Sequence, residues 1–579
     1  MIRRVGALRI VVLVIFGVIL ARLFCIQIIE HDSWVAKADE QHTLLEKIAA
    51  KRGEIYMMDK GEPVAVVLNQ ASYQVVIDPT VTKKEDIERV VKDYAKDYAV
   101  ANIDEVYDTE GLRYAIIAKN VPRDTAEQIA DAEIPAIWLK KTNQRVYPEG
   151  TLASGLLGFV NNDGVGQYGA EGSFNKLLSG EDGLIKTIAD VNKVALSIGK
   201  DNVKIPAKNG TDIVLSIDRG LEQGIEEIAA AAVDSTDATN AAVLVMDPNN
   251  GKVITMANVP DYDPSNYSNV KDVSVFNNYV TDVPYEPASI CKSFTFSAAL
   301  NVCKMTPDTT YFNQHYEKVD DWEIWNASQQ SSLYGTLTMR DAFYWSLNTG
   351  SIYALKLLGD NSSSINQRGR EVLYDYYYNK FRLGQNTGIE LAEAEGYIED
   401  PNDGWGRDST YANMTFGQNL GITMIQTATA FSAVVNGGTW RTPSVIEGQL
   451  VDSKIVPLET NREYVEDKIL SDETSATMRD LLVNNRKYKI DQGIDRPGYT
   501  IGGKTGTAQV VVDGAYDDSM SQLVGSYIGF LGPGGEMPKY VIMVKMWGEG
   551  QSLQGSDAIN LFDDLSNYVI DYMKIKPGA

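Results

Sequence analysis

The sequence predicts an α+β protein with a single N-terminal transmembrane helix, an α/β domain and a larger C-terminal α+β domain. Three observations lead to this prediction. One apolar segment lies near the N-terminus, mixed strand and helix patterns follow it, and strand patterns at both ends of the C-terminal region enclose a mainly helical middle. The 579 residues, 44% of them hydrophobic, suffice for two to four domains. We place the domains at residues 1–30, 31–209 and 210–579.

The N-terminal segment predicts an uncleaved membrane anchor. Residues 7–29 are mostly apolar, and a span of ~20 residues crosses the hydrocarbon core of a bilayer. Three arginines precede the unbroken part of this run: Arg3, Arg4 and Arg9. We therefore expect the short N-terminus to stay in the cytoplasm and the rest of the chain to be exported. A cleaved signal peptide or a lipid-anchored Cys25 would require small residues after the run, where Arg22, Leu23 and Phe24 are bulky.

The net charge and the small number of histidines exclude several classes of function. The formal net charge of -25 argues against a nucleic-acid partner. His31 and His42 lie in the predicted stalk, which leaves only His315 for the C-terminal domain, in a polar segment that we expect at the surface. A zinc site or a Ser-His-Asp triad cannot readily be built from one histidine. We expect no metal and no cofactor, and we expect Cys291 and Cys303 to be unpaired, small apolar core residues.

The N-terminal domain has patterns of structure but no cluster of catalytic groups. Residues 31–50 predict a helical stalk. Two strands, joined by a turn at Asn69–Ala71, and two helices are expected after it: strands Val64–Leu68 and Ser72–Ile77, and helices Lys83–Tyr98 and Ala126–Ala132. We interpret this domain as a spacer or interaction domain.

The C-terminal domain is predicted to build one sheet from both of its ends. Its strands are expected at Thr211–Ile217, Ala241–Met246, Lys252–Ala257, Thr500–Val512, Gly525–Leu531 and Tyr540–Met546, and its flanking helices at Leu221–Val233 and Asp557–Lys574. The sequence Pro248-Asn249-Asn250-Gly251 predicts a hairpin between the second and third strands.

Ser289 and Lys292 are the candidate nucleophile and base. Ser-x-x-Lys alone is weak evidence, because it also occurs at Ser173, Ser197 and Ser268. Only Ser289 follows a proline and begins an apolar helix, where free backbone N–H groups favour developing negative charge. Residues three apart share a helix face, so Lys292 can reach the serine hydroxyl. A lysine base must lose its proton well below its reference pKa of ~10.4, which burial or a second cation can bring about.

Two further motifs follow in order. Ser346-Leu347-Asn348 comes after a predicted helix at Thr338–Trp345, and its apolar flanks favour it over Ser364-Ile365-Asn366 in a polar loop. Lys504, Thr505, Gly506 and Thr507 lie on a predicted strand of small residues, which lets a substrate backbone approach and offers a cation and hydroxyls to a carboxylate. A phosphate-binding loop is the alternative, but its upstream glycine is absent.

Ser-x-x-Lys, Ser-x-Asn and Lys-Thr-Gly in this order resemble the signature of serine acyl-enzymes that act on D-Ala-D-Ala peptides and β-lactams. The chain resembles the class B penicillin-binding proteins, monofunctional peptidoglycan transpeptidases of bacteria, over nearly its whole length. Other segments that carry the likeness are Arg52–Ile55, Arg145–Pro148, Gly169–Glu171, Val245–Pro248, Tyr285–Pro287 and Gly417-Gln418. The resemblance implies a dimerisation-type pedestal domain and a penicillin-binding transpeptidase domain with an antiparallel sheet like that of serine β-lactamases.

The same resemblance implies a role for each candidate. Ser289 would attack the penultimate D-Ala carbonyl, Lys292 would be the general base and Ser346 would relay a proton to the leaving amine. Asn348 would hold the peptide amide and help orient Lys292. Lys504 and Thr507 would hold the terminal carboxylate, and the N–H groups of Ser289 and Thr507 would form the oxyanion hole.

The chain departs from the family pattern in three places. Alanine stands at Ala288, where glycine is usual, and we expect this change to leave the chemistry intact. The others are Asp59-Lys60-Gly61 and the run from Glu390 to Ala394, in place of Arg-Asn-Gly-like and Asp-Leu-Pro-Gly-Glu-like residues.

The resemblance also implies partners. These are stem peptides that end in D-Ala-D-Ala, β-lactam antibiotics and a separate polytopic membrane glycosyltransferase. A D,D-carboxypeptidase and a membrane-anchored β-lactam sensor or non-catalytic scaffold of the same fold remain as alternatives. The anchor and the domain ahead of the catalytic one favour the transpeptidase.

Overall fold

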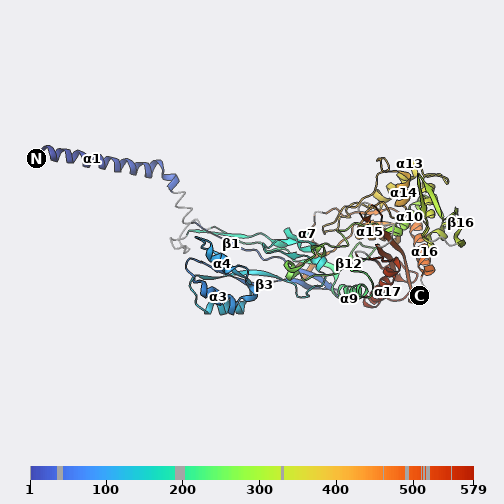
Figure 1. Ribbon diagram of the computed structural model, residues 1–579, viewed down its shortest axis with the longest axis horizontal. Coiled ribbons are helices and arrows are strands. Elements are labelled where there is room, and N and C mark those ends of the chain that lie inside the picture. Colours follow the sequence, from blue (N-terminus) through green and yellow to red (C-terminus); the bar gives the residue numbers. More distant parts are fainter. Residues whose placement is uncertain are drawn as a thin grey trace. The chain divides into compact units, whose positions relative to one another are not determined.

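The structure is a computed structural model that describes residues 2–578 except 35–42, 189–202, 328–330, 461, 490–494, 510, 513–514, 517–521 and 549–550 (Figure 1). The chain forms two compact units. One comprises Met1–Gly53 and Ser179–Thr211, and the other comprises Glu54–Leu178 and Asp212–Ala579.

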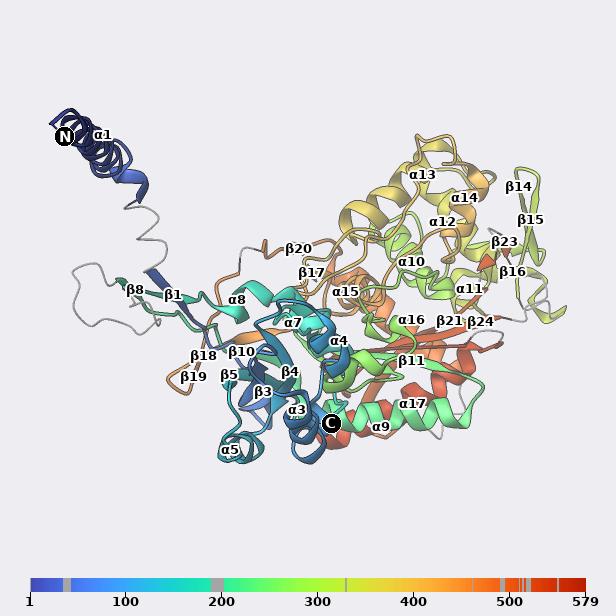
Figure 2. The ribbon, with the colours of Figure 1, turned by 60° about the vertical axis from the view of Figure 1, so that its left-hand side comes forward.

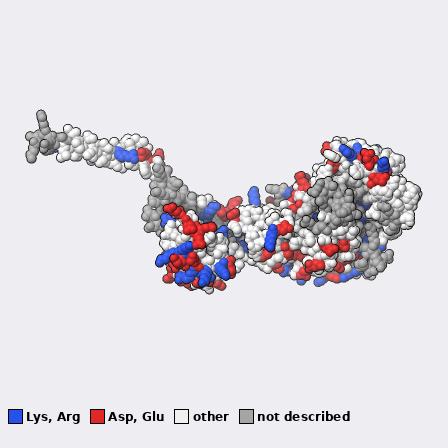
Figure 3. Space-filling view, viewed as in Figure 1, with Lys and Arg blue, Asp and Glu red and all other residues white. Residues whose placement is uncertain are grey.

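The first unit contains an apolar N-terminal helix and a small sheet. Helix α1 (Ile2–Phe24) continues into a π-helical turn (Cys25–Ile29). The span Leu8–Ile29 has a mean hydropathy of 2.7 and is long enough to cross a membrane, and none of that apolar stretch is buried. Its surface is almost free of charged side chains (Figure 3). The helix is therefore compatible with a membrane anchor.

The predicted helical stalk is wrong for its second half. Residues 35–42 lie outside the described part of the chain, but Thr43–Ile48 form strand β1. This strand pairs antiparallel with β8 (Gly183–Ile188), which in turn pairs with β9 (Val203–Ile205). Pairing with a segment more than a hundred residues away thus overrides the local helical pattern.

The second unit begins with a seven-stranded sheet that joins both predicted domains. Its order is β19-β18-β10-β2-β3-β4, and β5 also pairs with β3. The strands are β2 (Ile55–Asp59), β3 (Glu62–Ile77), β4 (Ala115–Val121), β5 (Ile137–Val146), β10 (Ile213–Asp218), β18 (Ile446–Val451) and β19 (Lys454–Val456). Because β2 runs parallel to β10, N-terminal strands are continuous with strands from the C-terminal region.

Two local predictions in this region need correction. The two strands expected at residues 64–77 form the single strand β3, because Asn69, Gln70 and Ala71 pair with Arg145, Gln144 and Asn143 of β5 instead of turning. The helix expected over Lys83–Tyr98 ends earlier, as α3 (Lys84–Asp93) followed by a 3-10 turn (Lys96–Tyr98). The remaining helices here are α4 (Ile103–Asp108) and α5 (Arg123–Asp131).

A buried ion pair stabilises the segment that follows β5 and leads toward the C-terminal region. Short elements follow β5: α6 (Ser154–Leu157), β6 (Phe159–Val160), β7 (Gly166–Gln167), α7 (Gly169–Ser173) and α8 (Asn175–Ser179). Arg145 Nε lies 2.6 Å from Glu171 Oε1, and both side chains are at most 6% exposed. A buried charge needs such a partner, so removing either side chain would leave the other charge buried and uncompensated.

A five-stranded sheet forms the centre of the C-terminal region, with the order β12-β11-β25-β24-β21. Its strands are β11 (Asn240–Met246), β12 (Val253–Val259), β21 (Tyr499–Gln509), β24 (Leu523–Pro533) and β25 (Tyr540–Trp547). All neighbours are antiparallel. The prediction that strands from both ends of the region form one sheet is confirmed for these five strands. The strand expected at Thr211–Ile217 is instead β10 of the seven-stranded sheet, where it pairs with β2 and β18.

Helices cover both faces of the five-stranded sheet (Figure 2). The amphipathic helices α9 (Arg219–Ser235) and α17 (Gly555–Tyr572) lie side by side on one face and enclose an apolar core. The other face packs on the helical middle, whose main members are α10 (Lys292–Asn301), α11 (Met339–Tyr344), α12 (Asn348–Leu358), α13 (Gln367–Tyr374), α14 (Asp408–Met414), α15 (Met424–Val435) and α16 (Asp472–Lys489). The remaining short strands are β13 (Thr310–Asn313), β14 (Tyr316–Val319), β15 (Trp322–Trp325), β16 (Gly335–Thr338), β17 (Thr439–Arg441), β20 (Glu466–Lys468), β22 (Val511–Val512) and β23 (Ala515–Tyr516).

Candidate active site

Ser289 lies in a tight turn at the start of a buried helix. The 3-10 turn η5 (Ala288–Cys291) runs directly into α10, so Ser289 occupies the first turn, as predicted. Side chains at positions i and i+3 of a 3-10 turn eclipse each other, which places Lys292 on the same side as Ser289. Ser289 is half-buried, whereas Lys292 is only 1% exposed.

The buried Lys292 amine reaches the Ser-x-Asn motif. Its Nζ donates to Ser346 O at 2.5 Å, to Ser346 Oγ at 3.1 Å and to Asn348 Oδ1 at 2.9 Å. It also lies 5.9 Å from the centre of the Phe416 ring. These contacts fix the amine beneath the serine turn.

Ser346 is held in an unusual backbone conformation between α11 and α12. Its φ is +57°, in the left-handed region that costs energy for a residue with a side chain. Two backbone bonds maintain the turn, from Ser346 N to Phe343 O at 3.1 Å and from Leu347 N to Ala342 O at 2.8 Å. The strained turn directs both the carbonyl and the hydroxyl of Ser346 toward Lys292.

A second lysine reaches the same hydroxyl from the sheet. Lys504 on β21 is 0% exposed, and its Nζ donates to Ser346 Oγ at 2.9 Å. The Ser346 hydroxyl therefore lies between two amines from different elements, Lys292 Nζ and Lys504 Nζ. The three motifs, which are separated by up to about two hundred residues, thus meet at one place.

Gly506 allows the strand to lie directly against the serine turn. A Cβ at this position would lie 2.4 Å from Pro287 O and 2.5 Å from Ser526 Oγ, so no other residue fits. Thr505 is half-buried and Thr507 is exposed. The Thr507 hydroxyl accepts a hydrogen bond from Gly555 N at 3.0 Å, which ties it to the start of α17.

The structure therefore brings together Ser289, Lys292, Ser346, Asn348 and Lys504, with Gly506 against the same turn. Sequence reasoning missed the support around Asn348. Its Nδ2 donates to the carbonyl of Trp325 on β15 at 2.9 Å, and a backbone carbonyl leaves no signal in a sequence. The predicted surface position of His315 is also wrong, because this side chain is half-buried with a buried Nδ1. Cys291 is buried as expected, whereas Cys303 is exposed, and both are free.

The run that departs from the family pattern carries two carboxyl groups, a buried one on Glu390 and a half-buried one on Glu393. Glu390 accepts hydrogen bonds from Ser444 Oγ at 2.8 Å and Val445 N at 3.0 Å, and pairs with Arg462 at 3.1 Å. Glu393 accepts from Thr387 N at 2.7 Å, and burial raises the pKa of Glu393 to about 7. Both residues fasten loops of the C-terminal region.

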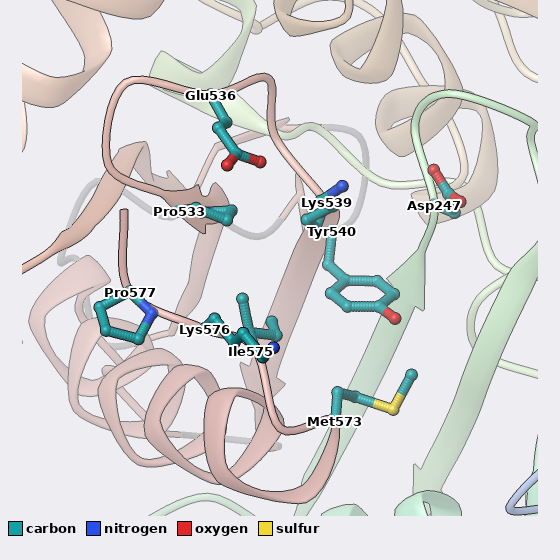
Figure 4. A pocket seen from close by; sticks show the side chains of 9 residues that line it. All are labelled: Asp247, Pro533, Glu536, Lys539, Tyr540, Met573, Ile575, Lys576 and Pro577. Carbon is teal, nitrogen blue, oxygen red and sulfur yellow. The ribbon is translucent and has the colours of Figure 1, made fainter. Parts of the chain in front are cut away.

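A separate cleft lies away from these motifs. Figure 4 shows its lining at the end of β24, the start of β25 and the tail after α17. Its volume is ≈ 360 Å³, and its charged residues, Asp247, Glu536, Lys539 and Lys576, are of both signs. It contains none of the predicted site residues. Within the described residues, no group of three His, Cys, Asp or Glu side chains is arranged to hold a metal ion.

Comparison with known families identifies both regions. The penicillin binding protein transpeptidase domain matches residues 241–567, which is more than half of the chain. The chain belongs to the penicillin-binding protein transpeptidase family. The penicillin-binding protein dimerisation domain matches residues 47–215. The family assignment and the two-domain fold expected from the motifs are thus confirmed.

Named relatives of this penicillin-binding protein extend over most of its length. It is 28% identical over 477 residues to Stage V sporulation protein D of Bacillus subtilis, a match that covers 82% of this chain and 67% of that protein. It is 26% identical over 473 residues to the peptidoglycan D,D-transpeptidase FtsI of Escherichia coli, with 81% and 74% covered.

Solved structures share the fold of this penicillin-binding protein. A peptidoglycan synthetase from Bifidobacterium adolescentis has a TM-score of 0.70 at 19% identity and covers 93% of this chain and 98% of its own. Penicillin binding protein 2X from Streptococcus thermophilus has a TM-score of 0.69 at 22% identity, with 92% and 80% covered. At these identities the likeness concerns the fold.

Proposed function

We propose that this protein is a membrane-anchored peptidoglycan D,D-transpeptidase that cross-links stem peptides through an acyl-enzyme on Ser289. The observation that carries the proposal is the convergence of two lysine amines on one hydroxyl. Lys292 and Lys504 lie 3.1 Å and 2.9 Å from Ser346 Oγ, directly under the turn that presents Ser289. A serine flanked by a base and a proton relay is the arrangement that acyl transfer requires.

The reaction proceeds in two balanced steps. Ser289 Oγ bonds to the carbonyl carbon of the penultimate D-Ala while its proton passes to neutral Lys292. The bond to the terminal D-Ala nitrogen then breaks, and the proton reaches this amine through the Ser346 hydroxyl. In the second step, an amine from a neighbouring stem peptide bonds to the ester carbonyl carbon. The bond from that carbon to Ser289 Oγ breaks, and the amine proton passes to Ser289 Oγ, which forms the cross-link and frees the enzyme.

The edge of β21 is the docking strand for the donor peptide. Among the described residues, β21 pairs in the sheet only with β24, so its other edge can pair with an extended substrate. Lys504, Thr505 and Thr507 supply a cation and hydroxyls for the terminal carboxylate, and the N–H groups of Ser289 and Thr507 stabilise the oxyanion. Asn348 holds the peptide amide. β-Lactams acylate the same serine.

The test is labelling by a fluorescent penicillin. The wild type is expected to become covalently labelled and Ser289→Ala to remain unlabelled. Ser268→Ala is the matched control, because Ser268 and Lys271 repeat the same spacing at an exposed position and labelling should persist. Labelling of Ser289→Ala would show that the nucleophile is another residue.

Product analysis separates transpeptidation from the other activities of this fold. Mass spectrometry after incubation with lipid-linked stem peptides should detect cross-linked dimers. Release of D-Ala without dimers would instead indicate a D,D-carboxypeptidase. Penicillin labelling with neither product would indicate a sensor or scaffold.

The anchor and its partner form the remaining part of the proposal. Residues 1–30 anchor the chain with a cytoplasmic N-terminus, residues 31–209 form the pedestal, and residues 210–579 act outside the membrane. The arginines before the apolar span support this orientation. The glycan strands come from a separate polytopic glycosyltransferase. Protease digestion of intact spheroplasts should remove the catalytic region, and crosslinking in membranes should capture the glycosyltransferase.

A further inference from the structure

Lys545 is a buried lysine outside the three motifs. It lies on β25 in the centre of the five-stranded sheet and is only 3% exposed. In the described part of the chain, its ammonium has neither a carboxylate nor a hydrogen-bond acceptor in contact. A buried charge without a counter-ion is costly, so its retention calls for another source of attraction.

Two aromatic rings enclose the Lys545 ammonium. Its Nζ lies 4.4 Å from the centre of the Tyr285 ring and 4.3 Å from that of the Trp547 ring. Trp547 is in turn packed edge-on against Tyr279, with 4.8 Å between ring centres. The faces of aromatic rings attract cations, most strongly when water is excluded. The ammonium thus ties β25 to Tyr285.

Tyr285 begins the segment that presents the nucleophile. It stands four residues before Ser289, and its backbone exchanges two hydrogen bonds of 3.0 Å with Ile422. Lys545 pairs with Ser526 of β24, and Ser526 pairs with Gly506 of β21. A Cβ added to Gly506 would lie only 2.4 Å from Pro287 O. These three paired residues therefore form a row across the sheet whose Gly506 end lies directly against the segment.

The segment 285–289 therefore contacts the sheet at two points. Tyr285 rests on Lys545 near the centre of the sheet, and Pro287 rests on Gly506 at its edge. A shift of the Tyr285 ring would be transmitted over four residues to the Ser289 hydroxyl. Placement errors on the order of 1 Å can lower rates by about 100-fold.

The groups around Lys545 leave its protonation dependent on burial. Tyr285 is a titratable group that contacts its ammonium, Ser526 lies beside Lys545 on β24, and Glu286 follows Tyr285 in the chain. The Glu286 carboxylate instead accepts a hydrogen bond from Asn419 N at 2.9 Å. Burial lowers the pKa of Lys545 to about 7. Only the protonated form is attracted to the rings, so the contact weakens as the pH rises through neutrality.

We propose that Lys545 is a positioning residue for the acylation of Ser289. Its charged form holds the Tyr285 ring and thereby fixes the position of Ser289. The proposal rests on the function proposed above. It assigns to the sheet behind the active site a direct influence on the nucleophile.

The experiment measures the second-order acylation rate of the full-length protein in detergent with a fluorescent penicillin from pH 5.5 to 9. The wild type should lose rate above about pH 7. Lys545→Met should acylate about tenfold more slowly at pH 6 and lose this alkaline decline. Lys545→Arg, which stays charged, should restore most of the rate at pH 6 and acylate without the decline. Lys454→Met, an exposed strand lysine on β19, is the control and should match the wild type.

A double-mutant cycle tests the path through Tyr285. Tyr285→Leu should reproduce the defect of Lys545→Met, and combining the two should add little. Additive effects, or a Lys545→Met profile identical to the wild type, would overturn the proposal. A lower melting temperature with an unchanged pH profile would leave Lys545 a purely structural role and equally overturn it. If Lys545→Met does not fold, the pH profiles of the acylation rates of Lys545→Arg and Tyr285→Leu test the proposal in its place. A wild type that never labels would refute the proposed function instead.

Discussion

Ala288, the residue before the candidate nucleophile Ser289, has a left-handed backbone conformation. Its φ is +48°, and it packs against Gly417, whose own φ is +83°. A Cβ on Gly417 would lie 2.1 Å from Ala288 O, so the two residues meet at backbone distance. The methyl group of Ala288 makes this conformation unfavourable by roughly 1–2 kcal/mol. The departure from the family pattern at this position thus has a measurable energetic cost.

Replacing Ala288 by glycine should relieve this strain. Ala288→Gly should raise the free energy of unfolding by about 0.5–1 kcal/mol, because the relief of strain exceeds the extra entropy of the unfolded chain. Urea unfolding measures the change. Ala298→Gly, in the middle of α10, is the contrasting control and should destabilise by at least about 1 kcal/mol. Equal destabilisation by both changes would contradict the strain.

Gly506 gives a prediction about activity. Gly506→Ala should reduce penicillin acylation by about 100-fold or more, because the new methyl would push the strand away from Pro287. Circular dichroism and stopped-flow labelling together separate this effect from unfolding. Gly404→Ala is the matched control, because nothing lies within 4 Å of its Cβ position. Normal acylation by Gly506→Ala would show that the close approach is dispensable.

The catalytic candidates could be found from sequence because their chemistry requires fixed residue types in a fixed order. Ser289, Lys292 and Lys504 fall into such short motifs. Lys545 and the Trp325 carbonyl could not be found in this way. The contact of Lys545 depends on which segments become neighbours in the fold. The Trp325 carbonyl is a backbone group that any residue supplies.

At the scale of elements, helix α9 carries a buried carboxyl group, Glu222, and a half-buried one, Glu226, on one face. Glu222 Oε2 accepts from Met256 N at 2.9 Å, and Glu226 Oε1 accepts from Ala153 N at 2.8 Å. Burial raises the pKa of both groups above the usual range, and each carboxylate disfavours the other. The helix thereby joins β12 to the turn before α6 through groups that favour the protonated state.

This pair predicts a pH dependence of stability. A carboxyl whose pKa is raised by folding stabilises the protein fully below its unfolded pKa, and the contribution falls as the pH rises toward the folded pKa. The free energy of unfolding should therefore decrease from pH 5 to pH 9. Glu222→Gln should remove part of this decrease. At pH 8 it should raise the free energy of unfolding by on the order of 1 kcal/mol or more.

Urea unfolding at several pH values tests this expectation. Glu88→Gln on the exposed face of α3 is the control, and its stability should follow the wild type at every pH. A Glu222→Gln variant that is less stable than the wild type at pH 8 would mean that this carboxyl is ionised in the folded protein.

Most elements of the C-terminal region could be predicted because their apolar patterns agree with their final positions. Strand β25, for example, begins at Tyr540 as expected. The misses occur where distant pairing decides the structure. Strand β1 has a helix-like sequence, and β3 continues through a turn-like one, because β8 and β5 supply partners that no local pattern reveals.

At the scale of the whole molecule, the proposed attachment to the membrane rests on one described helix. Deleting residues 1–30 should move the protein from the membrane fraction to the soluble fraction, because the span Leu8–Ile29 is the only described helix long and apolar enough to cross a bilayer. Penicillin labelling should persist, because the candidate catalytic residues lie in the second compact unit. Fractionation with alkaline extraction measures the change, and persistent membrane attachment would reveal a second contact with lipid or protein.

The order of strands in the central sheet also governs how a newly made chain folds. Strand β11 ends at Met246, yet its neighbour β25 begins only at Tyr540. While the ribosome adds the residues between them, one edge of β11 has no partner, and such edges attract other chains. This edge of β11 is therefore open to pairing with other chains until β25 has been added. A chain truncated by a nonsense mutation shortly before residue 540 would lack β25 altogether. We expect such a product to be degraded by proteases.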